Sequence, residues 1–414
     1  MKDYKSIVII GAVIIILILV VVGLEWLKRL ESPAASAVPY DIVTTIKGDA
    51  GTSRAFTWYT GDPDAAGRLE IVKGEKTSFT TGGVRKVKAD SASLKTDIGK
   101  RGVHKAEATG LEPGTTYTYR VGSGVEGAWS TAAVFTTAEN GNDSVTFINV
   151  TDSQGAATAD FKLWGNTLDK AIKTFPQASF IMHNGDLTEN PEDTAGWDEF
   201  FGNVQTWIAE IPLMPVTGNH DEVEGVADNF TSHFNLPENG AKDSIDGTSY
   251  SFDYGPIHVT VLNTESNLKK QSEWLEEDLA GTDKQWKIVA MHRPAYGGNT
   301  YKKVEDWTEI FDEYEVDLVL QGHNHEYSRS YPLLDGNIVP EGENPVGTER
   351  GTVYVVTNAA GAKFNEQKEE QFYHSVHFQN NKQMFAGITV TGETLTYQAY
   401  DVDGVMKDEF VLKH

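Results

Sequence analysis

Residues 179–186 read Ser-Phe-Ile-Met-His-Asn-Gly-Asp, and the rest of the sequence is best interpreted outward from this stretch. A short apolar run that is rich in β-formers and stops at a Gly-Asp step predicts a buried strand followed by a tight turn. In an open α/β sheet, ligands bind just beyond the carboxyl ends of the strands. We therefore expect Asp186 to lie on the edge of a ligand-binding crevice.

Four other apolar runs end in the same manner. Each predicts a strand, and each is followed at once by side chains that can bind a metal. The four polar endings are residues 151–154 (Thr-Asp-Ser-Gln), 218–221 (Gly-Asn-His-Asp), 292–294 (His-Arg-Pro) and 322–325 (Gly-His-Asn-His). Five strand ends would thus deliver carboxylates, amides and imidazoles to one edge, which predicts a metal site.

Composition limits the kinds of ligand and metal. The 414 residues carry a formal net charge of −25, which argues against nucleic acid as a partner because its phosphates would be repelled. An anionic substrate would need local positive charge, which bound divalent metals can supply. The chain has no cysteine, so disulfides, thiolate zinc sites and cysteine nucleophiles are excluded, and any metal must have nitrogen and oxygen ligands.

An apolar segment without charges begins at Ile7 and ends at Leu24. Its length is at the lower limit for a membrane-spanning helix, roughly 17–25 residues. We expect an uncleaved single-pass anchor and stalk in residues 1–37, with the folded part outside the cell. Lysine or arginine residues flank both sides of the segment, so they leave its orientation open. The alternative is secretion after cleavage near residues 35–37, Ala-Ser-Ala.

Residues 38–138 show short alternating runs separated by Gly, Pro and Asp turns, which predicts an all-β sandwich. The run at 111–121 resembles fibronectin type III domains, in which the first tyrosine, here Tyr117, packs at a corner. Residues 122–127 match the glycine fingerprint of dinucleotide-binding proteins, but a strand follows them instead of a helix. We therefore predict a hairpin loop there and reject an oxidoreductase. His104 is expected to be structural.

Residues 143–414 alternate between strand and helix patterns, which predicts an α/β domain. The predicted helices are 160–175, 197–210, 268–280 and 304–314. Further strands are expected at 249–254, 257–263 and 353–357. The tail, residues 385–412, alternates with period two around turn residues and predicts closing antiparallel hairpins.

The polar strand ends also suggest how metals would be arranged. Oxygen and imidazole ligands suit Fe, Mn or Zn better than Ca or Mg alone. A pair of metals needs one carboxylate that bridges them and separate ligands for each ion. Asp186 is the candidate bridge, because Gly185 permits the tight turn that brings its oxygens to the centre.

The ordered set of motifs resembles the calcineurin-like metallophosphoesterase superfamily. The set comprises Asp152-x-Gln154, Gly185-Asp186, residues 218–221, His292 and residues 322–325. Together with the fibronectin-like module and Asn-Ala-Ala-Gly at 358–361, the architecture is similar to purple acid phosphatases. This resemblance implies an α/β metallophosphoesterase β-sandwich flanked by helices, with two metal ions.

The resemblance also implies roles for individual residues. The first metal would be held by Asp152, Asp186 and His325, and the second by Asp186, Asn219, His292 and His323. His220 would contact the phosphate and act as general acid, while a metal-bound hydroxide attacks phosphorus. Asp221 would orient the loop that carries His220.

Two departures from the family pattern affect the site. A tyrosine gives purple acid phosphatases their colour, and its position is occupied here by Glu189, so no colour is expected. Gln154 instead offers an amide oxygen to the first metal, and whether Glu189 also ligates is left open. After His292 the family usually has further histidines near the substrate, whereas this chain has Tyr301, which we predict to bind substrate. His374 and His377 are expected to lie in a loop outside the site, and the less favoured alternative is that this loop approaches the site.

The resemblance implies a dinuclear phosphoesterase that hydrolyses phosphomonoesters, either small molecules or components of the cell envelope. Phosphodiesters or nucleotides are the alternative substrates, because the altered ligands of the first metal resemble those of other branches of the superfamily. An alternative of another class is a surface binding or adhesion protein with a catalytically dead domain.

Overall fold

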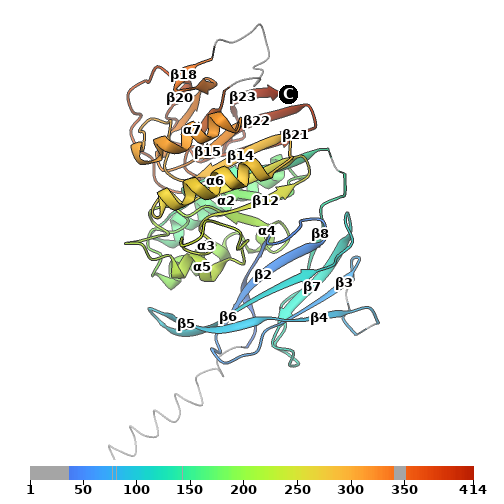
Figure 1. The fold of residues 1–414 in the computed structure, drawn as a ribbon. Helices are drawn as coiled ribbons and strands as arrows, with labels where there is room; N and C mark the ends of the chain where they lie inside the picture. The colour runs from blue at the N-terminus through green and yellow to red at the C-terminus, as the bar shows by residue number, and fades with distance from the viewer. Residues whose placement is uncertain (1–36, 77, 81, 142, 340–350) are drawn as a thin grey trace, which may run out of the picture.

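The computed structural model describes residues 37–76, 78–80, 82–141, 143–339 and 351–414. Figure 1 shows a β module in its lower half and a larger part built of strands and helices above it. None of the helices within these ranges is long and apolar enough to span a membrane. The predicted anchor from Ile7 to Leu24 lies outside the described residues.

The N-terminal module consists of two four-stranded antiparallel sheets, as predicted. The first sheet contains, in order, β1 (Tyr40–Thr45), β2 (Ser53–Thr60), β6 (Gly99–Thr109) and β5 (Asp90–Thr96). The second contains β4 (Arg85–Lys88), β3 (Arg68–Lys73), β7 (Thr116–Gly122) and β8 (Ala133–Thr136). Alternate residues of these strands, such as Leu69 and Ile71 of β3, enter one shared apolar core.

Local details of this module follow the expectations. The hydroxyl of Tyr117 accepts a hydrogen bond from the backbone N–H of Glu112 at 2.9 Å, which closes the corner before β7. The glycine run after β7 forms a loop that leads to β8, without a helix. His104 is fully buried and bonds the hydroxyls of Thr60 and Ser91 at 2.9 and 2.8 Å, so it is structural.

The second part contains two larger sheets. One has the order β11 (Leu213–Pro215), β10 (Ile181–His183), β9 (Val145–Val150), β21 (Met384–Val390), β22 (Thr394–Asp401) and β23 (Met406–Lys413). The other has β12 (Tyr250–Tyr254), β13 (Ile257–Leu262), β14 (Trp286–Met291), β15 (Leu318–Gln321), β19 (Val353–Val356), β16 (Tyr327–Ser330) and β20 (His374–Phe378). A two-stranded ribbon joins β17 (Leu333–Leu334) to β18 (Asn337–Ile338).

Helices cover the outer faces of these two sheets. They are α2 (Thr158–Thr174), α3 (Thr194–Gly202), α4 (Gln205–Ile208), α5 (Asp228–His233), α6 (Leu268–Gly281), η1 (Lys302–Val304) and α7 (Glu305–Glu313). Strand β14 shows the layering, because Ile288 and Ala290 join the core between the sheets while Val289 and Met291 pack with α6 and α7. A strand that is buried on both faces has a continuous apolar sequence, and for this reason these strands could be predicted.

Three of the four predicted helices are found nearly as expected, and one prediction was wrong. The helix expected at 197–210 is broken into α3 and α4, and Asn203 caps the end of α3. The predicted tail hairpins are present, and β21 also pairs antiparallel with β9. The tail therefore completes the sheet that carries Asp186.

The buried imidazole of His258 gives the fold a pH-dependent element. Its Nδ1 lies 2.7 Å from Asp253 and its Nε2 lies 3.0 Å from Asp278. Burial lowers the pKa of His258, but the two carboxylates raise it further, to about 9. Because this pKa exceeds the unfolded value of about 6.5, the bonds stabilise the fold fully below that pH and progressively less as the pH rises through 9.

We therefore expect His258→Gln to lower the free energy of unfolding by roughly 2–3 kcal/mol at pH 6 and by much less at pH 9.5. Urea unfolding of wild type and variant at both pH values measures the difference. A difference that is the same at both pH values would show that His258 is not charged in the folded protein.

Candidate metal centre

The polar strand ends meet between the two sheets of the second part. Asp152, Asp186 and Asn219 follow β9, β10 and β11 of one sheet, whereas His292 and His323 follow β14 and β15 of the other. The expectation of a single sheet edge was therefore incomplete. Period and composition reveal strands and their polar ends, but they do not show which strands pair with one another.

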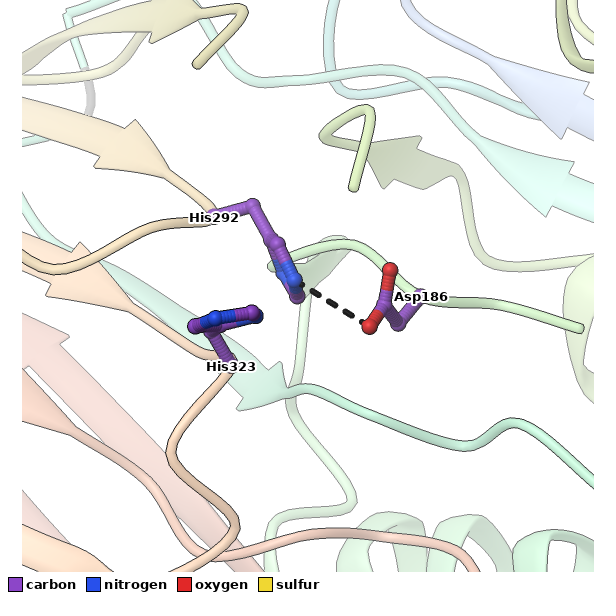
Figure 2. Close-up of side chains that lie close together, drawn as sticks. All are labelled: Asp186, His292 and His323. Carbon is purple, nitrogen blue, oxygen red and sulfur yellow. Dashed lines mark ion pairs between the residues drawn. The ribbon is translucent and has the colours of Figure 1, made fainter. Parts of the chain in front are cut away.

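Asp186 lies at the middle of the site, fully buried. Its Oδ2 is 3.2 Å from Nε2 of His292, the ion pair drawn in Figure 2, where the ring of His323 lies beside that of His292. Its Oδ1 accepts a hydrogen bond from the backbone N–H of His220 at 2.8 Å. The backbone N–H groups of Asp186 and Gly218 donate to Asp221 Oδ2 at 2.7 and 2.9 Å, so Asp221 joins the Asp186 turn to the loop that carries His220.

The backbone at the candidate ligands is strained and closely packed. Asp152, Asp186, His323 and His325 all have positive φ angles, 52°, 54°, 70° and 52°, which are uncommon for residues other than glycine. A Cβ on Gly218 would lie 2.3 Å from Oδ1 of Asp186, so this position needs glycine for the carboxylate to fit. Strained residues of this kind persist where the surrounding structure enforces them, and they cluster at functional sites.

Two groups of potential ligands share Asp186. Asp186, His292 and His323 form one group, and Asp152, Asp186 and His325 form the other. Within each group the candidate ligand atoms lie within 4.8 Å of one another. A carboxylate common to two such groups is the arrangement that a pair of metal ions requires.

Buried polar atoms without partners show that the site fits cations. Oδ1 of Asn219 and Oε1 of Gln154 have no hydrogen-bond partner in the described part of the chain, and Nε2 of His292 has the Asp186 ion pair but no well-aligned hydrogen bond there. Such atoms are costly to bury unless something binds them. All three are metal-ligand atoms of the predicted set, so these residues fit the metals that the sequence implies.

The charges of the site also favour metal binding. Burial raises the pKa of Asp186, but His292 lowers it more, so the carboxylate is ionised. Burial lowers the pKa of His292, but Asp186 raises it to about 10. Burial also lowers the pKa of His325, but Asp152 raises it above its usual value. Metal ions could replace these protons, because ligand imidazoles must be neutral. His323 is already neutral, since burial, His292 and Arg293 lower its pKa to about 4.

Carbonyl groups orient two of the candidate ligands. Nδ1 of His292 bonds the carbonyl of Asn184 at 2.8 Å, and Nδ1 of His325 bonds the carbonyl of Lys363 at 3.0 Å. A carbonyl only accepts, so both Nδ1 atoms carry hydrogen and both Nε2 atoms face the site. Such contacts fix the tautomer and the ring orientation of metal-binding histidines.

The two departures from the family pattern occupy different places. The amide nitrogen of Gln154 lies 3.3 Å from Asp186 Oδ2 and 3.4 Å from His325 Nε2, and a half-turn of the amide would put its oxygen there. Glu189 forms an ion pair with Lys363 instead, and its carbonyl accepts from Nδ1 of His220 at 2.8 Å. Gln154 thus lies among the ligand atoms of the first group, whereas the Glu189 carboxylate is engaged elsewhere.

Arg293 is a site residue that the sequence reasoning missed. Its Nη1 is 3.1 Å from Nε2 of His323, its Nε is 2.8 Å from Glu265, and its guanidinium lies 5.1 Å from the ring centre of Tyr301. Tyr301 is therefore connected to the metal centre through Arg293. The signal for this residue in the sequence is its position directly after His292.

Comparisons with known proteins agree with this geometry. Residues 146–327 match the calcineurin-like phosphoesterase family, and residues 39–137 match the purple acid phosphatase N-terminal domain. Acid phosphatase type 7 of Mus musculus is 27% identical over 78% of each chain. A probable inactive purple acid phosphatase of Arabidopsis thaliana is 26% identical over 65% of this chain and 50% of that one. The structure of a purple acid phosphatase from yellow lupin seeds, 19% identical, superposes with a TM-score of 0.79 and covers 92% of this chain and 75% of that chain.

The two stacked sheets, with candidate metal ligands between their strand ends, define a metallophosphoesterase, a class of phosphoric ester hydrolases. Within that class, the chain combines a calcineurin-like phosphoesterase domain with a purple acid phosphatase N-terminal domain.

Proposed function

We propose that this protein is a dinuclear metal-dependent phosphatase that hydrolyses phosphate monoesters. The observation that carries the proposal is the sharing of Asp186 between the two groups of ligand atoms. A single metal site would explain one group, but it would leave the other group of buried carboxylates and imidazoles without a function.

The chain offers a full set of ligands for each ion. Asp152, Gln154, Asp186 and His325 would hold the first, and Asp186, Asn219, His292 and His323 the second. Nitrogen and oxygen ligands of this kind suit Fe, Mn or Zn. Two such ions lower the pKa of a coordinated water to about 7 and neutralise charge on the phosphoryl oxygens. That local positive charge would offset the net charge of −25 for an anionic substrate.

Residues of the chain would position the ester and handle its protons. The half-exposed His220 lies next to Asn219, and its Nδ1–H is held by the Glu189 carbonyl, which leaves Nε2 to serve the leaving group. Tyr301, held beside His323 by Arg293, would contact the remainder of the ester.

The experiment compares a phosphomonoester with the matching diester. We expect purified protein loaded with Fe, Mn or Zn to hydrolyse an aryl phosphate faster than the bis-aryl phosphate, with loss of activity after chelation. A faster diester reaction would identify a phosphodiesterase on the same site. The similarity to a probable inactive purple acid phosphatase makes a third outcome informative. Stoichiometric metal without any hydrolysis would indicate a binding protein.

The segment from Ile7 to Leu24 supports a proposed location. We propose that it anchors the protein in the cell membrane with the phosphatase domain outside. Protease added to intact cells should then remove the domain from the membrane fraction. A domain that is protected in intact cells and digested only after lysis would contradict this orientation.

A further inference from the structure

A second cluster of metal-ligand side chains shares no residue with the candidate metal centre. It consists of Glu370, His374 and His377, whose ligand atoms lie within 4.8 Å of one another, with Glu326 next to them. The two histidines belong to β20, at the edge of the seven-stranded sheet, which Figure 1 labels near its upper end. None of these four side chains has a role in the phosphatase site proposed above.

A bulge in β20 brings the two imidazoles together. Residues three apart on a regular strand point to opposite faces of the sheet. Here His374 pairs with Ser330 and Val376 pairs with Arg329, so β20 advances two residues while β16 advances one. The extra residue turns His374 onto the same side as His377, and their ring centres are 4.1 Å apart.

Both imidazoles direct the same atom at one carboxylate. Nδ1 of His374 is 3.4 Å from Glu370 Oε1, and Nδ1 of His377 is 3.0 Å from Glu370 Oε2. Nδ1 of His374 also accepts the backbone N–H of Gln371 at 3.2 Å, a hydrogen bond that a metal ion would replace. The other nitrogens of the two imidazoles have different neighbours: Nε2 of His374 bonds the Gly297 carbonyl at 3.3 Å. Nε2 of His377 lies 3.4 Å from Glu326 Oε2. In zinc-binding histidines, the ring nitrogen that does not bind the metal usually donates a hydrogen bond to a carbonyl or a carboxylate, and both kinds of acceptor are present here.

The buried carboxylate of Glu326 is an independent sign of a cation. The side chains of Glu326 and His377 are fully buried. Oε1 of Glu326 and Nε2 of His377 lack a well-aligned hydrogen-bond partner in the described part of the chain, although Lys368 N–H donates to Glu326 Oε2 at 2.8 Å. An ionised carboxylate is costly to bury without a compensating positive charge.

We propose that Glu370, His374 and His377 bind a third divalent transition-metal ion of the Zn²⁺ class. The ligands would be one carboxylate oxygen and the two Nδ1 atoms, with a water in the fourth position of a tetrahedron. Glu326 would accept the Nε2–H of His377 and balance the charge of the ion. The site is separate from the metal pair, and it does not depend on the proposed reaction.

The third ion would fix the position of a long loop that contacts the metal centre. The loop, residues 361–373, joins the end of the Asn-Ala-Ala-Gly motif to β20 and contains Glu370. Its Lys363 carbonyl orients His325, and its Lys368 N–H bonds Glu326. An ion that holds Glu370 against β20 would therefore hold this loop over the first-metal ligands.

Metal content of three proteins tests the proposal. After equilibration with Zn²⁺ and dialysis, we expect three ions per chain in wild type and two in Glu370→Gln combined with His374→Gln. We expect one ion in Asp186→Asn, which lacks the proposed bridging ligand. In Co²⁺-loaded Asp186→Asn, the visible absorption of a tetrahedral N/O site should appear, and Glu370→Gln should abolish it. Glu370 is largely exposed, so this substitution tests the site without disturbing the core.

His258→Gln is the matched control, because His258 also lies between two carboxylates but has no second imidazole beside it in the described structure. It should keep three ions. Two ions in both wild type and the double variant would overturn the proposal. A reduced count in Asp186→Asn but no change in the double variant would support the metal pair alone. No change in Asp186→Asn with a loss in the double variant would support the third site alone.

Discussion

Asp186→Asn is expected to remove the metal pair and to lower phosphatase activity by more than about 10³-fold, the upper range for loss of one electrostatic donor at an active site. Asp186 supplies a carboxylate to both ligand groups, and its Oδ2 faces His292 at 3.2 Å. An amide of the same size keeps one oxygen but loses the negative charge, so it cannot bridge two cations. The hydrogen bond that the backbone N–H of residue 186 donates to Asp221 would remain, and the loop should keep its shape.

Metal analysis and steady-state kinetics on the same preparation measure both effects, and circular dichroism checks the fold. Asp169→Asn is the matched control, because it makes the same chemical change at an exposed ion pair with Lys173 on α2. Exposed pairs of this kind contribute about 0.3–0.5 kcal/mol, so both metal and activity should persist. Full activity in Asp186→Asn would refute the bridging role.

Much of the metal centre could be predicted because its signals are local. Each ligand-bearing loop begins where a doubly buried strand ends, and the change from apolar to polar residues marks that point in the sequence. Glycines such as Gly185 and Gly218 stand beside Asp186, where a Cβ would collide with the site. The glycine-rich decoy after β7 could be rejected for the same local reason, since a strand followed it.

Features that depend on contacts between distant segments could not be predicted. The pairing of β9 with β21 joins residues more than 200 positions apart, and no periodicity reports it. The bulge that places His374 beside His377 arises from the pairing of β20 with β16. The prediction of a loop for these two residues was wrong, because both belong to β20. The break after α3 had a signal, because Gly202 and Asn203 are typical of a helix end, but the apolar spacing of the flanking residues concealed it.

His220→Ala is expected to retain both metals and to lose roughly 10²–10⁴-fold in kcat/KM for esters with poor leaving groups. Nδ1 of His220 donates to the carbonyl of Glu189 at 2.8 Å, so this nitrogen keeps its hydrogen. Nε2 can then donate a proton only from the imidazolium form. A leaving alkoxide needs that proton, whereas a nitrophenolate leaves without it. The loss should therefore be much smaller for 4-nitrophenyl phosphate than for an alkyl phosphate.

A series of aryl and alkyl phosphates measured in wild type and variant separates proton donation from binding. In the variant, the rate should depend more steeply on the pKa of the leaving group, because nothing replaces the missing proton. His414→Gln changes an imidazole that pairs with Asp317, away from the metal centre, and should leave the series unchanged. Equal losses for good and poor leaving groups would show that His220 binds the phosphate without donating a proton, since a binding contact stabilises every ester to the same extent.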